Sequence, residues 1–67
     1  MMFLQKRFRK DLCAQLIEGH IYDEKAAVTL VSIGYGSDKE EKVAEQMFVE
    51  GVLGRTDDGR YYYIRPC

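Results

Sequence analysis

Apolar residues recur every four positions along the first quarter of the chain. Because an α-helix turns once in about 3.6 residues, side chains spaced in this way share one face of a helix. The pattern predicts an amphipathic helix from about residue 4 to Glu18, and Gly19 is suited to end it. The residues that would line its buried face are Leu4, Phe8, Leu12 and Leu16.

The segment after this helix has a mixed pattern. Residues 20–22 are expected to form a short extended piece, and Asp23 can then cap a second helix that stops at Gly34. The β-branched residues between positions 28 and 33 would also suit a strand, but the two alanines before them favour a helix. The positions that this helix would bury are Ala26, Ala27, Leu30 and Val31.

A strong local signal begins at Ser37. Ser37 and Glu40 have the spacing of a capping box, in which each side chain accepts a hydrogen bond from the backbone N–H of the other residue. They predict a third helix that ends near Glu50, with Gly51 in the left-handed conformation. The apolar face of this helix would consist of Val43, Ala44, Met47 and Phe48.

The last part of the chain reads as a β-hairpin. Its strands are predicted at residues 52–56 and 60–65, and residues 57–59 (Asp-Asp-Gly) supply the turn. Alternation along the second strand would place Tyr61 and Tyr63 on one side of the sheet, with Tyr62 and Ile64 on the other.

Residues 43–55 and 57–64 together carry a family resemblance. They comprise a helix, an acidic-Gly stop, two apolar residues, a basic residue, a polar turn and an aromatic return strand. This order resembles the winged helix-turn-helix superfamily, and the resemblance extends over nearly the whole chain. It implies one α+β domain over residues 1–67, with three helices, a C-terminal two-stranded hairpin as the wing, and a short strand near residues 20–22 that pairs with it.

The resemblance also implies binding to DNA, with the third helix in the major groove and the wing on phosphate. The charge distribution weakens this expectation, because the net charge is −1 and residues 23–51 carry three basic against seven acidic side chains. A stripe at helical spacing nevertheless presents Lys39, Lys42 and Gln46. The other candidate DNA contacts are Arg55, Arg60 and Arg65 in the hairpin, and Lys6 and Lys10 in the first helix.

Ordinary explanations exist for the same residues, and a second function stays open. Lysines on a helix face are commonly solvated, and charges on an edge strand prevent aggregation. An acidic third helix with Val49 exposed would suit a protein-binding adaptor or inhibitor. A homodimer is expected in either case, because a core this small is marginal by itself.

The sequence offers no support for an enzyme, a cofactor or a metal site. It lacks a nucleophile–base set, a Gly-rich phosphate loop and a close cysteine pair, and its single histidine is His20. No stretch approaches the roughly 20 apolar residues that cross a membrane. The chain is therefore expected in the cytoplasm, with Cys13 as a buried free thiol and Cys67 as a free, exposed one.

Overall fold

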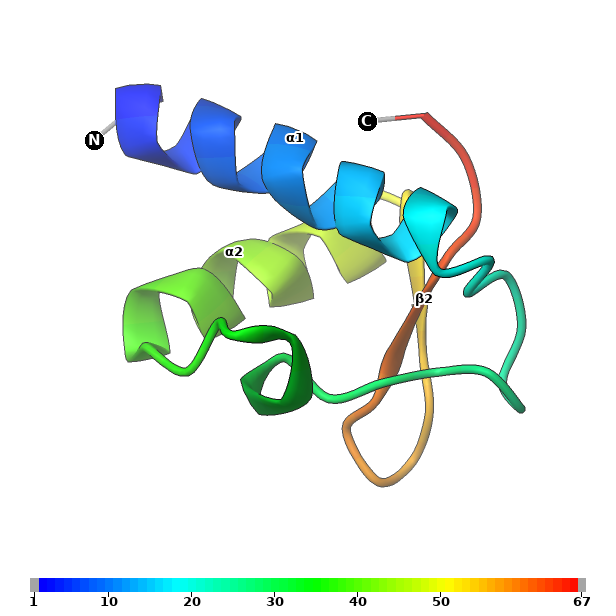
Figure 1. Ribbon diagram of the computed structural model, residues 1–67. Helices are drawn as coiled ribbons and strands as arrows, with labels where there is room; N and C mark the ends of the chain where they lie inside the picture. Colours follow the sequence, from blue (N-terminus) through cyan, green and yellow to red (C-terminus); the bar gives the residue numbers. More distant parts are fainter. Residues whose placement is uncertain (1, 67) are drawn as a thin grey trace.

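The computed structural model describes residues 2–66 of the chain, with side chains from residue 6 onward. Figure 1 shows α1 lying across α2, with the β-hairpin near the C-terminal end of α1. The α+β class is therefore confirmed, but the structure has two α-helices where the sequence predicted three. In chain order the elements are α1 (Met2–Glu18), the 3-10 helix η1 (Val31–Ile33), α2 (Asp38–Val49), β1 (Leu53–Arg55) and β2 (Tyr61–Tyr63).

The first helix follows its hydrophobic pattern. Leu12 and Leu16 are completely buried, and the ring of Phe8 packs edge-on against Tyr35 with 5.0 Å between the ring centroids. The predicted contribution of Leu4 falls on a side chain outside the described part of the chain. Helix α1 thus supplies one wall of a core whose members are Phe8, Leu12, Cys13, Leu16, Ile21, Leu30, Ala44, Met47, Val52, Leu53 and Tyr61.

Helix α1 ends at Glu18, as predicted, but the left-handed residue that follows it is not Gly19. The backbone N–H of His20 donates to the carbonyl of Ile17, and that of Ile21 donates to Leu16, a pair of bonds typical of a Schellman cap. His20 has φ +55 and occupies the left-handed position, rather than Gly19. A histidine therefore holds a conformation that costs a residue with a β-carbon more than it costs glycine.

The prediction of a second helix over residues 23–33 is wrong, because these residues do not form an α-helix. Asp23 does cap, because its carboxylate accepts from the backbone N–H of Ala26, but the turn does not extend into a helix. The chain passes instead through an isolated β-bridge at Val28 and then forms η1, which Gly34 ends at φ +94. Of the four residues expected to be buried, Ala27 and Leu30 are, whereas Ala26 and Val31 are exposed.

Helix α2 begins and ends as its local sequence predicts. The Ser37 hydroxyl accepts from the backbone N–H of Glu40, and the Glu40 carboxylate accepts from the backbone N–H of Ser37, each at 3.2 Å. The capping box is therefore complete, and Gly51 follows the helix at φ +83. On the apolar face Ala44 and Met47 are fully buried, Val43 is half-buried and Phe48 is largely exposed.

The predicted hairpin is confirmed with shorter strands. Strands β1 and β2 pair antiparallel with Gly54 opposite Tyr62, and Gly59 provides the turn at φ +84. The ring of Tyr62 lies directly over Gly54, so that a β-carbon on Gly54 would overlap it. This close approach explains why a glycine occupies the middle of a strand.

The strand that joins the hairpin lies later in the chain than expected. Residues 20–22 form no strand, although the carbonyl of Ile21 accepts from the backbone N–H of Tyr63 at 2.8 Å. The two-way pairing is made by Val28, whose N–H and carbonyl both bond to Tyr61, at 3.0 and 2.7 Å. Strand β2 therefore lies between β1 and this single bridging residue.

Cys13 differs from its prediction in one respect. Its burial against the core agrees with the sequence, but its sulfur is disulfide-bonded and is not a free thiol. The prediction made for Cys67 lies outside the described residues.

Candidate functional site

An ion pair joins the two α-helices at one side of the molecule. Arg9 on α1 donates from both terminal nitrogens to the carboxylate of Glu50, just after α2, at 2.6 and 3.0 Å. Gln46 donates to the same carboxylate at 3.3 Å. These hydrogen bonds from Arg9 and Gln46 hold the pKa of Glu50 below its usual value. The pair shows which flank of α1 faces which flank of α2.

Most of the predicted helical contacts lie along this joined side. On α1, Lys6 lies three residues before Arg9, and Lys10 follows Arg9 directly. On α2, Lys42 and Gln46 precede Glu50 at successive steps of four residues, so they share its side of the helix. We call this exposed set the basic seam: Lys6, Lys10, Lys39, Lys42 and Gln46.

The three hairpin arginines are engaged within the fold. Arg60 donates to the Asp58 carboxylate at 3.1 Å and reaches the carbonyl of Ala27 at 3.5 Å. Arg65 donates to the carbonyl of Glu50 at 2.7 Å, beyond the end of α2. The guanidinium of Arg55 lies 5.7 Å from the centre of the Tyr61 ring. Each of these arginines therefore already contacts another group of the chain.

Carboxylates occupy the other side of α2, toward the hairpin. Glu41 and Glu45 are exposed and lie near enough to Tyr61 to raise the pKa of its hydroxyl, although burial is the main cause and Arg55 opposes it. The Tyr61 hydroxyl is buried and has no hydrogen-bond partner among the described residues. The exposed surface of α2 thus changes from basic on the α1 side to acidic on the hairpin side.

The hairpin turn is also acidic. Asp57 and Asp58 are both exposed at its tip. Hydrogen bonds from the Thr56 hydroxyl and from Arg60 lower the pKa of Asp58. Since phosphate repels carboxylates, this tip is poorly suited to the DNA contact that the wing was expected to make.

The sequence interpretation missed the part played by Arg9. Arg9 and Glu50 are separated by 41 positions, and no local pattern indicates that they meet. Only the packing of α1 on α2 brings them together. Their contact then identifies the flanks of the two helices that meet, and the lysines named above lie near those flanks.

Other classes of site receive no support from the described residues. No group of three or more histidine, cysteine, aspartate or glutamate side chains within residues 6–66 is placed to hold a metal ion. Among the helices of the described chain, none combines the length and the apolar character needed to cross a membrane. No protein-family model, curated protein or solved structure matches the sequence or its fold.

Proposed function

We propose that the protein binds DNA as a small winged-helix regulator, with the basic seam as its contact surface. The observation that carries the proposal is the Arg9–Glu50 ion pair, which shows that the flank of α1 near Lys6 and Lys10 meets the flank of α2 that carries Lys39 and Lys42. Each lysine that neutralises a phosphate releases counterions, and this release supplies much of the affinity of proteins for DNA.

The chain order supports the winged-helix interpretation. A helix is followed by a residue that pairs with the hairpin, a short helical turn, a second long helix and a two-stranded hairpin. In this arrangement η1 takes the place of the predicted second helix, and α2 is the helix that approaches the duplex. Gln46 is the polar side chain of the seam that can donate and accept hydrogen bonds at a base edge.

The proposal moves the supporting phosphate contacts from the hairpin to α1. Arg60 and Arg65 already bond to groups of their own chain, so gripping phosphate would require them to leave those partners. Lys6 and Lys10 have no such partners among the described residues. We therefore expect α1, and not the tip of the hairpin, to make the second set of contacts.

A salt titration tests this function. Binding of a labelled mixed-sequence duplex, followed by fluorescence anisotropy, should weaken steeply with salt, and Lys42→Ala or Lys6→Ala should each reduce the log–log slope by about 1. Lys25→Ala is the matched control, because Lys25 is an exposed lysine outside both helices. Absence of binding at low salt, or an equal effect of Lys25→Ala, would contradict the proposal.

A protein-interaction module is the second candidate, and one observation favours it. Val49 is 74% exposed at the end of α2, on the outer face that it shares with Lys42 and Glu45. An exposed aliphatic side chain surrounded by both charge signs is more typical of a protein interface than of a DNA surface. If this candidate is correct, Val49→Asp should abolish capture of a specific partner while Lys42→Ala has little effect.

We also propose that the active form is a homodimer. A domain of this length buries a limited core, and pairing two copies would add buried surface. A dimer would also present two copies of α2 to two half-sites. Sedimentation at micromolar concentration should then give twice the mass of one chain, and a monomer across that range would contradict this part.

A further inference from the structure

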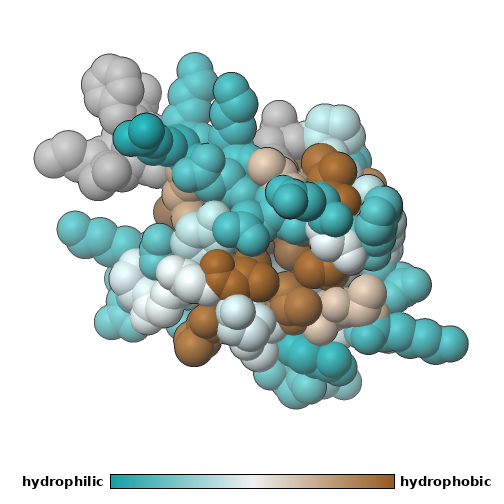
Figure 2. All heavy atoms as spheres, in the orientation of Figure 1, coloured by the Kyte–Doolittle hydropathy of each residue, from teal (hydrophilic) through white to brown (hydrophobic). Residues whose placement is uncertain are grey.

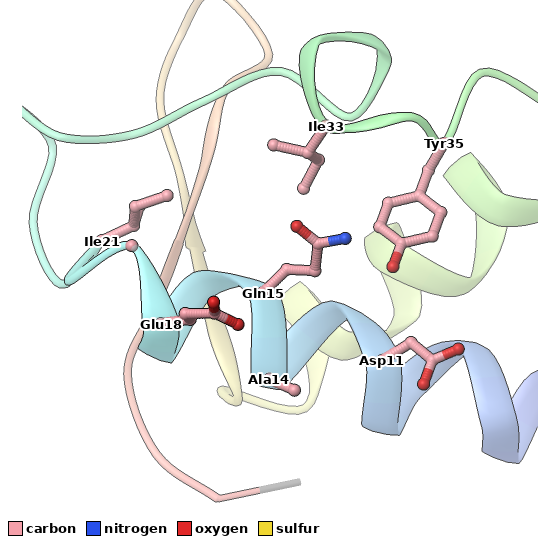
Figure 3. Close-up of a pocket in the computed structure, with 8 residues that line it drawn as sticks. Asp11, Ala14, Gln15, Glu18, Ile21, Ile33 and Tyr35 are labelled. Carbon is pink, nitrogen blue, oxygen red and sulfur yellow. The ribbon is translucent and has the colours of Figure 1, made fainter.

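A shallow groove runs along the flank of α1 opposite the basic seam. Figure 3 shows α1 forming one wall, while η1 and the residue that follows Gly34 form the other. Figure 2 shows apolar side chains gathered beneath α1 on this face, with hydrophilic side chains around them. The residues that line the groove are Asp11, Ala14, Gln15, Glu18, Gly19, Ile21, Ile33 and Tyr35.

The helical wall of the groove is polar and acidic. In Figure 3 the amide of Gln15 points between Ile33 and Tyr35, while the carboxylates of Asp11 and Glu18 stand at the two ends of the wall. All three polar residues of this wall are exposed. Within the described part of the chain, none of their side chains has a hydrogen-bond or ion-pair partner. The wall therefore offers acceptors that the fold itself does not use.

The opposite wall and the floor are apolar. Ile33 is half-buried at the end of η1, and Ile21 is buried at the end of the groove nearest the hairpin. Tyr35 is fixed by its edge-on contact with Phe8, and in Figure 3 its hydroxyl points toward α1 near Asp11. This hydroxyl also has no hydrogen-bond partner among the described residues. An occupant of the groove would thus meet an aliphatic surface on one side and acceptors on the other.

The charge of the groove selects the sign of its occupant. Its lining includes two carboxylates and no lysine or arginine. Asp11 and Glu18 are seven residues apart on α1, or about 10 Å, which leaves room for an apolar side chain between two cations. Lys6 and Lys10 of the basic seam lie on another flank of α1, and Lys39 and Lys42 lie on α2. Arg7 is the nearest cation, exposed one turn before Asp11 and beyond the N-terminal end of the wall.

We propose that this groove binds a peptide segment of a partner protein in which basic side chains flank an aliphatic one. The basic side chains would pair with Asp11 and Glu18, and the aliphatic side chain would lie against Ile33 and Ile21. Charge complementarity excludes DNA as the occupant, because the carboxylates would repel phosphate. This surface is separate from the basic seam, so one copy of the protein can hold DNA and a basic peptide at the same time.

A matched pair of double variants tests the proposal. The probe is a fluorescein-labelled peptide GKLAKLAKG, with GELAELAEG as the charge-reversed probe. Asp11→Asn/Glu18→Gln should weaken binding of the lysine probe about tenfold, since two ion pairs are lost. Glu41→Gln/Glu45→Gln alters the net charge by the same amount on the hairpin side of α2, and it should change affinity less than about twofold. The glutamate probe should not bind.

Amide NMR shifts locate the site independently of affinity. Titration of the lysine probe into labelled protein should shift the amides of Ala14, Gln15 and Ile33, and leave that of Lys42 in place. An Ile33→Ala variant, checked for folding by circular dichroism, should weaken the same binding. DNA binding by Asp11→Asn/Glu18→Gln should be unchanged, so failure of the groove and failure of the basic seam give different results.

Several outcomes would overturn the proposal. These are absence of binding of the lysine probe at millimolar concentration, equal loss in the two double variants, or amide shifts confined to α2 and the hairpin. A fourth would be a loss of self-association in Asp11→Asn/Glu18→Gln, measured by sedimentation. That result would identify a second copy of this chain as the occupant instead of a partner peptide.

Discussion

Residues 37–63 and residues 19–36 reach their structures by different routes. The first stretch contains α2 and the hairpin. Local chemistry predicts the ends of α2 and the hairpin turn, and the strands form where predicted but are shorter. The second stretch contains a cap, a turn, one bridging residue and η1, and its predicted helix does not form. The two stretches are adjacent in the sequence and share one core, so the difference lies in the range of the interactions that define them.

The comparison shows where local propensity is sufficient. The Ser37–Glu40 capping box satisfies helix N–H groups with side chains only three residues apart, whatever else the chain does. At Val28 the backbone bonds to Tyr61, which lies 33 residues further along the chain. A two-way sheet contact with the buried Tyr61 outweighs the modest preference of Ala26 and Ala27 for a helix.

The largest expected effect on stability comes from a substitution at Gly54, within residues 37–63. Gly54→Ala places a methyl group inside the ring of Tyr62, so either the ring or strand β1 has to move. We expect a loss of about 3 kcal/mol in the free energy of unfolding, as for overpacking in a tight site. Urea denaturation measures it, and Gly36→Ala is the matched control, because Gly36 also lacks a positive φ and the nearest atom lies 4.0 Å from the added β-carbon. A cost for Gly54→Ala no greater than that of the control would show that the Tyr62 ring imposes no constraint.

A substitution at Val28 tests whether its bridge to Tyr61 stabilises the conformation of residues 19–36. Val28→Pro removes the N–H that donates to the Tyr61 carbonyl and leaves that acceptor unsatisfied. We expect a loss of about 2 kcal/mol, together with faster amide exchange at Tyr61, Ile33 and Tyr35. Unchanged exchange at η1 would indicate that residues 29–36 hold their conformation without the bridge, which would remove the contrast between the two stretches.

A smaller effect is expected from the capping box. Ser37→Ala removes the side chain that accepts from the Glu40 N–H, and it should lower the free energy of unfolding by about 1 kcal/mol. Ser32→Ala is the matched control within residues 19–36, where the Ser32 hydroxyl donates to the Thr29 carbonyl. Thermal unfolding followed by circular dichroism compares the two. Equal costs would mean that the cap contributes no more than an ordinary turn bond.

The smallest expected effect is an increase in the free energy of unfolding. His20→Gly replaces a residue at φ +55 with the one residue that adopts this conformation without steric cost. We expect a gain of about 0.5 kcal/mol, because the greater freedom of glycine in the unfolded chain offsets part of the relief. Chemical denaturation should show this gain in the wild-type background. A loss of stability would instead indicate that the contact of the His20 and Tyr22 rings, 6.1 Å apart, stabilises the end of α1.

The candidate site divides in the same way as the fold. The helical stripe of Lys39, Lys42 and Gln46 could be recognised from sequence, because residues three and four apart on a helix share a side. The engagement of Arg60 and Arg65 could not, since their partners Ala27 and Glu50 lie 33 and 15 positions away. The acidic groove was missed for a related reason. It exists only because η1 and Tyr35 fold back against α1, and no sequence pattern links Glu18 to Ile33.

The sequence by itself determined helix α1, the capped helix α2 and the hairpin turn, because each is defined by periodicity or by side-chain bonds to neighbouring backbone groups. It also determined the α+β class. Only the tertiary structure decided that residues 23–33 are not a helix, that Val28 pairs with β2, and that η1 and Tyr35 form a groove with α1. The physical reason is that these features depend on groups far apart in the chain, whose energies exist only once the core of Leu12, Leu16, Met47, Leu53 and Tyr61 has brought them together.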